Sequence, residues 1–550
     1  MRDMKPIASF LVIAVLTVAL SGCSSSGGGG GGNGSSLAIT TTSANFAVAG
    51  NPYASTLVAT GGTPPYTWAV VSGLPAWASL NTATGVLTGT PATLDVGNFN
   101  PTFRVTDTAG AMRQGTVLLA VHNRTDIVSV DNSTPPVPGT AASNKPAISN
   151  DGRFVAFVSM ASNLVPGVGG SQIYLHDWQT NQTSLVSKNN AGNPADPAAT
   201  TTSPSISSDG RFVAYVSNAT NLVTGTSGQQ IYLYDTQTSQ TFPNGQTTLI
   251  SKDNSPIPLA GNGASSAPSI SRDGCFVAFA SLSTNFGIPG GNQQIYVRGP
   301  LPGPGTCVGV EQISLVSQDN SALPGIGASS SPSISSNGFI VAFISNATLL
   351  TGVTGQQIYL RNVQTGVTSL VSQDNTGNPA SAGSSNTAPS VSGDGRFVAF
   401  VSNATNFGAS GQQIYLHDSQ ASVPFPNGQT ILLSKDNTNP VPIPGNFPSD
   451  SPSISIDGCV VAFTSQSTNL GAPANQIFIR GPLAIGGCAG IEQTSLVSKD
   501  NANNPANSVA GGTIDPSANG NGQFIAFSST ATNLVSPAPG NRQIYVRAMP

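Results

Sequence analysis

One motif recurs seven times along the chain: S-I-S-x-D-G-x-F-V-A-F-x-S, then a variable loop, then Q-I-Y-L/V. Its clearest copy runs from Ser205 to Ser217, and Gln230 to Leu233 supply the second half. An Asp-Gly or Asn-Gly pair marks the centre of each copy, and successive pairs lie 57 to 64 residues apart. These pairs begin at Asp151, Asp209, Asp273, Asn337, Asp394, Asp457 and Asn521. Self-similarity at a nearly constant period indicates a repeat architecture.

Each repeat predicts four short strands. Strand A is the S-I-S run, and strand B is F-V-A-F-V-S, whose side chains alternate with period two. An Asp-Gly pair between two such runs predicts a hairpin with a type I′ turn, which needs positive φ at both central positions. Strand C is Q-I-Y-L, and strand D is T-S-L-V-S. Four short antiparallel strands, repeated radially, are typical of a β-propeller blade.

The ends of the repeat region predict how the ring closes. The seventh repeat stops at Gln543 to Val546 and has no strand D before Pro550. The missing run, Asp126 to Val130, precedes the first repeat and is followed by Asp131-Asn132, as strand D is in other repeats. An N-terminal strand that completes the last blade removes both exposed sheet edges. We therefore predict one seven-bladed β-propeller over residues 126–550.

Composition limits the classes of partner. Charged residues make up only 8% of the 550-residue chain, and the formal net charge is −4. Nucleic-acid binding depends on a basic patch or stripe, and the sequence contains none. We therefore expect no nucleic-acid partner.

Residues 1–23 predict a targeting segment. Arg2 and Lys5 precede a mostly apolar run from Ile7 to Leu20. This run is shorter than the roughly 20 residues that a membrane span needs, so a signal peptide is the better interpretation.

The segment ends in Leu20-Ser21-Gly22-Cys23, which resembles the bacterial lipobox. The resemblance implies cleavage before Cys23 and diacylation of that residue, with an ordinary signal peptide as the alternative. Residues 24–36 are rich in Gly and Ser, as expected of a flexible tether. Ser24 stands where an Asp would favour inner-membrane retention, so the resemblance implies the outer membrane.

Residues 37–122 predict a second, smaller β-domain. Short strand-like runs separated by turn clusters are typical of a sandwich. The runs are Leu37–Thr41, Thr56–Thr60, Tyr66–Val71, Gly85–Thr88, Thr102–Thr106 and Thr116–Val121. The segment resembles the bacterial putative-Ig, or cadherin-like, module at Gly61 to Trp68, Leu80 to Pro91 and Phe103 to Gly110. The resemblance implies an Ig-like fold and leaves the function open.

The resemblance to a cadherin-like module makes calcium the cofactor to consider. Calcium takes six to eight oxygen ligands, so several carboxylates must converge. The segment offers Asp95 and Asp107, with Asp126 just beyond it. We interpret Asp107 as a turn cap and predict no cofactor, with calcium as the alternative.

The strand motifs of residues 126–550 resemble the TolB-type, WD-like propeller repeat in all seven units. TolB itself has an α/β N-terminal domain and six blades, so the resemblance implies the repeat fold but not the Tol–Pal partnership. The predicted fold class is all-β: an Ig-like β-sandwich followed by a seven-bladed β-propeller closed by an N-terminal strand.

The five cysteines divide into Cys23 and two equivalent pairs. Cys275 and Cys307 lie in the third repeat, and Cys459 and Cys488 lie in the sixth. Antiparallel pairing places the start of strand B beside the end of strand C, so each pair can form a disulfide within its blade. An oxidising envelope favours disulfides. A metal site is the alternative, but two cysteines without His or carboxylate partners make a poor one.

The histidines have structural interpretations. His176 and His417 follow strand C at a position that is Tyr234 or an arginine in the other repeats. This variability predicts a solvated blade edge rather than a catalytic position. His122 ends the Ig-like domain and is predicted to be part of the linker.

Two sets of recurring polar residues also predict loop structure. A pair of Asp or Asn residues follows each strand D, and we interpret it as an Asx-turn rather than a ring of cation-binding carboxylates. The pairs begin at Asp131, Asn189, Asp253, Asp319, Asp374, Asp436 and Asp500. In six repeats an asparagine follows strand B and is predicted to fix a loop by hydrogen bonding. These residues are Asn163, Asn221, Asn285, Asn406, Asn469 and Asn533.

The channel-lining strands contain no Ser-His-Asp order, no His-Glu-x-x-His motif, no phosphate-binding Gly loop and no close acidic pair. We therefore predict a monomeric, membrane-anchored envelope lipoprotein that binds a protein or a glycan without catalysis. The D-to-A loops, such as Ser255–Ala267 and Thr438–Ser451, vary most between repeats and are where recognition is expected. The alternative is an envelope enzyme that acts on polysaccharide through scattered aspartates on one propeller face.

Overall fold

The structure is a computed structural model that describes residues 36–288, 291–301, 307–349, 353–422, 426–438, 441–473, 475–484, 487–507 and 512–550. The predicted signal peptide and Cys23 lie outside these residues. The described residues form β-strands and no α-helix, so the predicted all-β class is confirmed. The described residues also form four short 3-10 helices: η1 (Thr93–Asp95), η2 (Thr284–Phe286), η3 (Thr405–Phe407) and η4 (Thr468–Leu470). None of the described helices is long and apolar enough to span a membrane.

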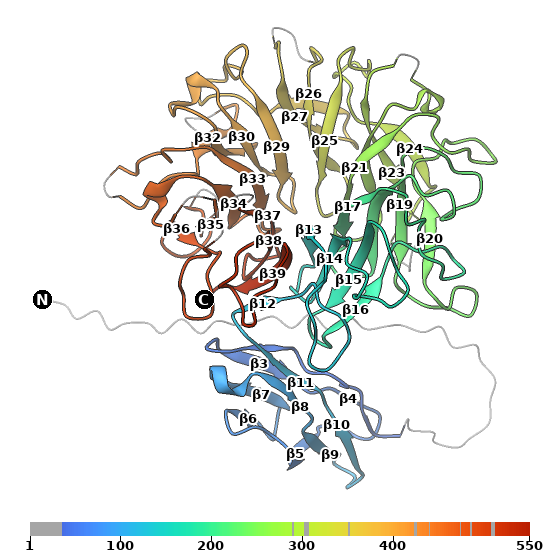
Figure 1. The fold of residues 1–550 in the computed structure, drawn as a ribbon, viewed down its shortest axis with the longest axis vertical. Coiled ribbons are helices and arrows are strands. Elements are labelled where there is room, and N and C mark those ends of the chain that lie inside the picture. Colours follow the sequence, from blue (N-terminus) through green and yellow to red (C-terminus); the bar gives the residue numbers. More distant parts are fainter. Residues whose placement is uncertain are drawn as a thin grey trace, which may run out of the picture.

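A small domain of short strands precedes the ring of sheets (Figure 1). Its sheets pair β1 with β4, β10 with β9 and β5, β2 with β11 and β8, and β3 with β7 and β6. The strands are β1 (Ala38–Ile39), β2 (Ala47–Val48), β3 (Tyr53–Thr56), β4 (Ala59–Thr60), β5 (Thr67–Ser72), β6 (Ala78–Leu80), β7 (Val86–Gly89), β8 (Gly97–Phe99), β9 (Thr102–Thr106), β10 (Met112–Thr116) and β11 (Leu119–His122). Trp68, Leu87, Phe103, Val105 and Leu119 form its core.

Five of these strands were not among the predicted runs. They are β2, β6, β8 and β10, together with most of β3. The β10 sequence, MRQGT, is exposed along most of its length and lacks the apolar alternation that marks a half-buried strand. The predicted run Thr56–Thr60 is in fact divided into β3 and β4 by Leu57 and Val58.

The described part of the repeat region contains seven four-stranded sheets, which we call blades 1 to 7. In each blade, strand A is innermost and strand D is outermost. Blades 1 to 3 are, in order from strand A to strand D, blade 1, β13 (Ser143–Ile148), β14 (Phe154–Ser159), β15 (Gln172–Asp177) and β16 (Gln182–Leu185); blade 2, β17 (Thr201–Ile206), β18 (Phe212–Ser217), β19 (Gln230–Asp235) and β20 (Gln246–Leu249); and blade 3, β21 (Ser265–Ile270), β22 (Val277–Ser281), β23 (Gln294–Gly299) and β24 (Gln312–Leu315). Blades 4 to 6 are blade 4, β25 (Ser329–Ile334), β26 (Ile340–Ser345), β27 (Gln357–Asn362) and β28 (Val367–Leu370); blade 5, β29 (Asn386–Val391), β30 (Phe397–Ser402), β31 (Gln413–Asp418) and β32 (Gln429–Leu432); and blade 6, β33 (Ser449–Ile454), β34 (Val461–Ser465), β35 (Gln476–Gly481) and β36 (Gln493–Leu496). Blade 7 consists of β37 (Thr513–Ala518), β38 (Phe524–Ser529) and β39 (Gln543–Ala548), with β12 (Thr125–Ile127) as its strand D.

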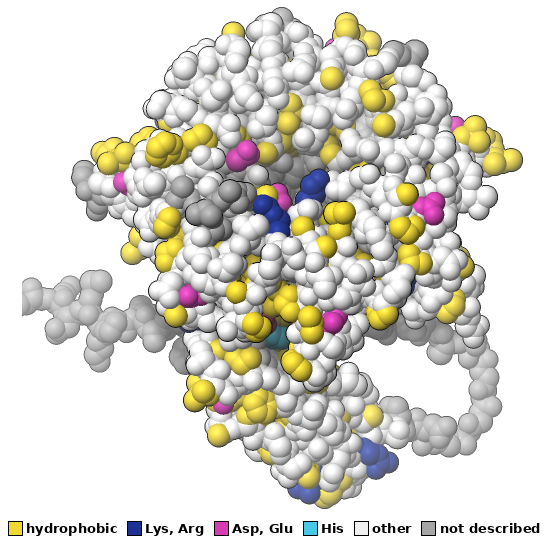
Figure 2. Space-filling model, in the orientation of Figure 1, with side chains coloured by type: hydrophobic (Ala, Val, Ile, Leu, Met, Phe, Trp, Pro, Cys, Tyr) yellow, Lys and Arg dark blue, Asp and Glu magenta, His cyan; other side chains and the backbone are white. Residues whose placement is uncertain are grey.

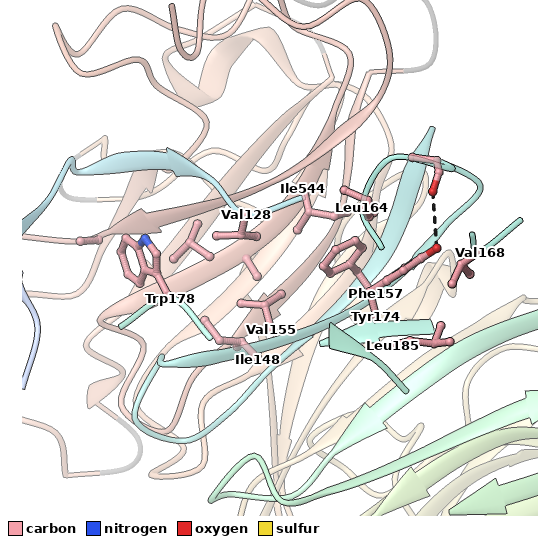
Figure 3. Close-up of a cluster of buried hydrophobic side chains, with 14 of the residues drawn as sticks. Val128, Ile148, Val155, Phe157, Leu164, Val168, Tyr174, Trp178, Leu185 and Ile544 are labelled. Carbon is pink, nitrogen blue, oxygen red and sulfur yellow. Dashed lines mark hydrogen bonds between the residues drawn. The ribbon is translucent and has the colours of Figure 1, made fainter. Parts of the chain in front are cut away.

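Strand β12 closes the ring as predicted. It pairs antiparallel with β39, with Asp126 opposite Val546, and Val128 continues the contact by donating its N–H to Ile544 O at 2.9 Å. Each strand A contacts strand A of the next blade, and β37 contacts β13, so the cycle is complete. Figure 3 shows the apolar cluster at this junction, where Val128 and Ile544 pack with Val155.

The Asp-Gly and Asn-Gly pairs form hairpins, but the predicted type I′ turn is wrong. Only the glycine of each pair has positive φ, for example 78° at Gly152, and none of the preceding Asp or Asn residues does. The loop is longer than two residues, because Ser149 is the last to bond across it, donating its N–H to Phe154 O at 2.9 Å. The Asp151 carboxylate stabilises the loop by accepting from Ser149 Oγ at 2.6 Å and from Arg153 N at 3.0 Å.

Both predicted disulfides form within their blades. Cys275 and Cys307 have Cα atoms 5.5 Å apart, and Cys459 and Cys488 have Cα atoms 5.8 Å apart. These separations lie in the usual range for a disulfide. The register explains the pairing, since Cys275 and Cys459 each lie two residues before strand B begins, beside the end of strand C.

The small domain packs against the junction of blades 7 and 1. Phe46 contacts the Trp178 ring at a centroid distance of 4.9 Å, and Trp178 contacts Phe524 at 5.7 Å. The indole N–H of Trp178 donates to Asp126 Oδ2 at 3.1 Å, and His122 Nδ1 lies 3.2 Å from the same oxygen. Burial alone would raise the pKa of Asp126, but the bonds from His122 and Trp178 outweigh it, and the pKa is lowered. His122 is therefore a buried interface residue at the end of β11 rather than part of the linker, so the prediction from the sequence is wrong.

Candidate functional site

The D-to-A loops lie together on one face of the propeller, because every strand D ends and every strand A begins at the same end of the channel. We call this the loop face. The A-to-B and C-to-D turns lie on the opposite face. The loop face is the candidate recognition site, and its geometry depends on three sets of repeated hydrogen bonds.

A glutamine at the start of each strand C holds the following D-to-A loop. Gln172 Nε2 donates to Ala195 O at 2.9 Å, while Gln172 Oε1 accepts from Ser187 Oγ at 2.5 Å. The equivalent bond to a loop carbonyl is made by Gln230, Gln294, Gln357, Gln413, Gln476 and Gln543. These amides are buried, so the base of every loop is anchored in the blade.

The first residue of each pair after strand D forms the predicted Asx-turn. Asp131 Oδ1 accepts the N–H groups of Ser133 at 3.1 Å and Val137 at 2.9 Å. The same pattern is found at Asn189, Asp253, Asp319, Asp374, Asp436 and Asp500. At Asp374, burial would raise the pKa, but hydrogen bonds from Thr376, Asn406 and the loop backbone lower it to about 2.

The second residue of each pair has a role that the sequence analysis missed: it joins neighbouring blades. Asn132 Oδ1 accepts the N–H of Thr183 at 2.6 Å, and its Nδ2 donates to Thr183 O at 2.9 Å. The equivalent acceptors are Asn190, Asn254, Asn320, Asn375, Asn437 and Asn501. This position is Asn in all seven copies, whereas the first position is Asp or Asn. An amide can both donate and accept, whereas an ionised carboxylate only accepts, and that difference was the available signal.

The asparagine after strand B fixes the D-to-A loop, as predicted. Asn163 Nδ2 donates to Pro138 O at 3.1 Å, and Thr140 N donates to Asn163 Oδ1 at 2.8 Å. The same donation to a loop carbonyl is made by Asn221, Asn285, Asn406, Asn469 and Asn533.

The tips of several anchored loops expose large apolar side chains. Ile257 is 82% exposed and Ile326 is 89% exposed. Other exposed apolar residues on these loops are Leu259, Leu323, Val441, Ile443 and Phe447. Charged side chains are few on the surface drawn in Figure 2. The loop face therefore combines a rigid base with tips that differ from blade to blade.

Many acidic groups elsewhere in the blades are engaged in ion pairs. Asp177 pairs with Arg153 at 2.6 Å, and the same pair recurs as Asp235 with Arg211 and as Asp418 with Arg396. Burial would raise the pKa of Asp177, but the hydrogen bond and charge of Arg153 outweigh this effect, so the pKa is lowered. In blades 3 and 6, Arg298 pairs with Glu311 at 2.6 Å and Arg480 with Glu492 at 2.8 Å.

His176 and His417 are buried, so the predicted solvated blade edge is wrong. His176 Nδ1 is 2.9 Å from Thr183 Oγ1 and His417 Nδ1 is 3.0 Å from Thr430 Oγ1, both in strand D of the same blade. These threonines in turn contact the preceding blade, since Thr183 Oγ1 donates to Val130 O at 2.5 Å and Thr430 Oγ1 donates to Gln373 O at 2.6 Å. In blade 3 the equivalent Arg298 donates to Lys252 O of the preceding blade at 2.7 Å. The position varies because Arg, His and Tyr fill this gap between blades differently, not because it is exposed.

Acidification below pH 6.5 is expected to destabilise the propeller through these histidines. Burial lowers the pKa of each to about 4, whereas an unfolded histidine titrates near its ordinary value of 6.5. The unfolded chain therefore binds more protons between these values, and stability is lost as the pH falls through this window. We expect a loss of about 2 kcal/mol per histidine between pH 7 and pH 5.

Urea unfolding of wild type and His417→Gln at the two pH values measures this effect. Glutamine does not titrate, so the variant should lose less stability on acidification than wild type. An equal loss in both proteins would show that His417 is not the source.

The three aspartates considered for calcium have separate structural partners. Asp95 Oδ2 accepts the N–H of Ala92 at 2.7 Å, and Asp107 accepts from Thr63 N at 2.9 Å and Ala111 N at 2.8 Å. Asp107 is thus a turn cap, as predicted, and these backbone bonds, led by that of Thr63, lower its pKa. Among the described residues, no three His, Cys, Asp or Glu side chains gather as a metal site would require.

Comparison with known proteins identifies the small domain. Residues 36–122 match the family model described as "Putative Ig domain". No curated protein matches the chain.

Solved structures similar to the chain include an oligogalacturonate lyase from Vibrio parahaemolyticus, with 12% identity, a TM-score of 0.44, and coverage of 89% of this chain and 99% of that one. Another is the propeller domain of the Trilobed protease from Pyrococcus furiosus, with 12% identity, a TM-score of 0.40, and coverage of 74% and 93%. A third is the periplasmic gluconolactonase of Pseudomonas aeruginosa, with 13% identity, a TM-score of 0.32, and coverage of 78% and 95%. Similarity this low supports no inference about activity.

Proposed function

We propose that the protein is an envelope lipoprotein, anchored through Cys23, whose propeller binds a partner at the loop face without catalysis. The Ig-like domain holds the ring at the end of the tether formed by residues 24–36. Of the two partner classes, a protein or a glycan, we favour a protein. The TolB-type resemblance of the repeat is consistent with a binding role of this kind.

The exposed apolar loop tips carry this proposal. Exposed apolar groups on a soluble domain mark contact sites for proteins or membranes when they lie on one functional surface. Ile257, Leu323 and Ile326 lie on loops whose bases are held by Gln230 and Gln294 amides and by Asx-turns. Variable tips on a rigid base are the usual arrangement for recognition.

The engagement of the ionisable groups supports a non-catalytic role. A general acid or base must reach the substrate in a defined protonation state. The loop aspartates accept backbone N–H groups in Asx-turns, Asp177, Asp235 and Asp418 pair with arginines, and His176 and His417 are enclosed between blades. Each of these groups already has a structural partner. The alternative, an enzyme that acts on envelope polysaccharide, needs groups free of such partners.

The proposal is tested by binding with two matched variants of residues 24–550. The loop-face variant carries Ile257→Ser, Leu323→Ser and Ile326→Ser. The control carries Val308→Ser, Val310→Ser and Ile491→Ser, which are at least comparably exposed apolar residues on the C-to-D side. Wild type and both variants are immobilised and incubated with detergent-solubilised envelope proteins and, separately, with purified cell-wall glycan.

We expect wild type and the control to retain one dominant protein, and the loop-face variant to lose at least about tenfold in affinity, since burying two or three aliphatic side chains contributes several kcal/mol. Retention of glycan instead of a protein would show that the partner is a glycan. Equal binding by both variants would overturn the loop-face assignment. Release of shortened or altered glycan would overturn the non-catalytic function.

A further inference from the structure

The seven innermost strands enclose a cavity of about 120 Å³ in the channel of the propeller. Every blade contributes one residue to a central layer of its wall: Ala147, Ser205, Ser269, Ser333, Ser390, Ser453 and Ser517. A second layer supplies Arg272, Ser336 and Gly393. No acidic residue lines the cavity.

The six serines of the central layer form a ring of hydroxyl groups. Ser205 Oγ accepts the N–H of Ile270 in the next blade at 3.1 Å, and Ser333 Oγ accepts that of Val391 at 3.0 Å. Ser269, Ser390, Ser453 and Ser517 make the same bond to the next blade at 3.0 to 3.2 Å. Because each oxygen accepts a backbone N–H, its own hydrogen remains available to donate.

Blade 1 shows that the inner strand folds without the hydroxyl group. Its equivalent residue is Ala147, and strand β13 there keeps the same bulge and register as in the serine blades. The inner strands therefore form without a hydroxyl at this position. Six hydroxyl groups thus line one cavity while each also accepts a backbone N–H of the next blade.

Arg272 supplies the positive charge. The guanidinium has no hydrogen-bond or ion-pair partner among the described residues, although its backbone O accepts from Ser208 N at 2.9 Å. Buried Arg298 and Arg480, in contrast, each pair with a glutamate. Arg272 keeps some exposure toward the channel, yet it is enclosed deeply enough that burial lowers its pKa to about 10. A guanidinium remains charged at neutral pH even so, and an unpaired charge in such a place is costly.

Two neighbours of Arg272 complete the site. Ser336 Oγ is buried and has no hydrogen-bond partner in the part of the chain that the structure describes. Gly393 leaves it room, since a Cβ at that glycine would lie 2.6 Å from Ser336 Oγ. Lys and Arg side chains lie at the hollow in the middle of the ring, with Asp or Glu side chains beside them (Figure 2).

We propose that this cavity binds one small oxyanion, either a free ion such as phosphate or the carboxylate of a larger ligand. The Arg272 guanidinium pairs with the anion, and hydroxyl groups of the serine ring and Ser336 donate to its oxygens. The cavity holds several water volumes of about 30 Å³ each, which is enough for such an ion. The inference goes beyond the loop-face function and does not depend on it.

Titration calorimetry of residues 24–550 with inorganic phosphate and with acetate, at constant ionic strength, tests the proposal. We expect saturable binding of at least one of them. Arg272→Met should weaken it by at least about tenfold, because a charge-assisted hydrogen bond is lost. Ser333→Ala should weaken it by a smaller factor while leaving the fold intact, as Ala147 does in blade 1. Preference for phosphate indicates a free ion, and preference for acetate indicates a carboxylate ligand.

Arg113→Met, at an exposed position in the Ig-like domain, is the matched control and should bind as wild type does. The shift in thermal unfolding temperature on adding phosphate gives a second measurement, which does not depend on the heat of binding. Phosphate stabilises many proteins by exclusion from their surface, so only the difference between wild type and Arg272→Met counts. Absence of saturable binding in wild type, or equal binding by Arg272→Met, would overturn the proposal.

Discussion

A chain shortened to residues 131–550 is expected to lose the closed ring, whereas one shortened to residues 124–550 is expected to keep it. The longer chain retains β12, which pairs with β39 and closes blade 7. The shorter chain loses Val128 and Val130, which are almost completely buried. Burial of two valines alone contributes about 3–6 kcal/mol, and the loss also leaves the β39 edge unpaired.

Urea unfolding and size-exclusion chromatography of the two shortened chains measure this effect. We expect residues 124–550 to unfold cooperatively as a monomer and residues 131–550 to be much less stable and to associate through the open edge. Equal stability of the two chains would show that β12 does not hold the ring closed.

Trp178→Ala is expected to destabilise the protein by about 3–5 kcal/mol, the usual cost of truncating a buried aromatic side chain. The Trp178 side chain is 1% exposed and contacts Phe46, His122 and Phe524. The substitution also removes the indole N–H that Asp126 accepts, so a partly buried carboxylate loses one of its partners.

Phe46→Ala is the matched comparison, because it removes the contact from the Ig-like side and leaves the blade 1 core in place. Urea unfolding should show a smaller loss for Phe46→Ala than for Trp178→Ala. Limited proteolysis should cut the connection near Arg124 faster in both variants. A loss below about 1 kcal/mol for Trp178→Ala would contradict the packing described here.

Features that depend on the repeat period were predictable from the sequence. Seven copies of one strand pattern gave the blade, and the displaced strand at Asp126 to Val130 gave the closure. The cysteine pairs were predictable because antiparallel register places residues such as Cys275 and Cys307 in the same part of a blade.

Features that depend on the contact between blades were not predictable in the same way. The sequence shows that His176 and Arg298 share a position, but not that its hydrogen bonds lead to the neighbouring blade, through Thr183 for His176 and directly for Arg298. The same limit applies to Arg272. Its position in the repeat is Ser208 in blade 2 and Gly393 in blade 5, so nothing in its immediate neighbours marks a channel residue.

One unrecognised signal was the proline in every strand A. Pro146 follows Lys145, which has a φ of 50°, and the strand register shifts at this point. Equivalent positive φ values occur at Ser203, Ala267, Ser331, Ala388, Ser451 and Asp515. A proline has no N–H for the ladder and is confined to bulges or edges. Its recurrence therefore indicates a bulge in strand A, the innermost strand of every blade. The S-I-S run alone suggests a regular strand.

Site-specific photo-cross-linking tests the central claim that the partner binds at the loop face. A photoreactive side chain is placed at Ile326 on the loop face or at Ile491 on the opposite face, two sites of nearly equal exposure at 89% and 85%. Each protein is incubated with the envelope fraction and irradiated. We predict one dominant cross-linked protein from position 326 and none from position 491. The same product from position 491 alone, or from both positions equally, would contradict binding at the loop face.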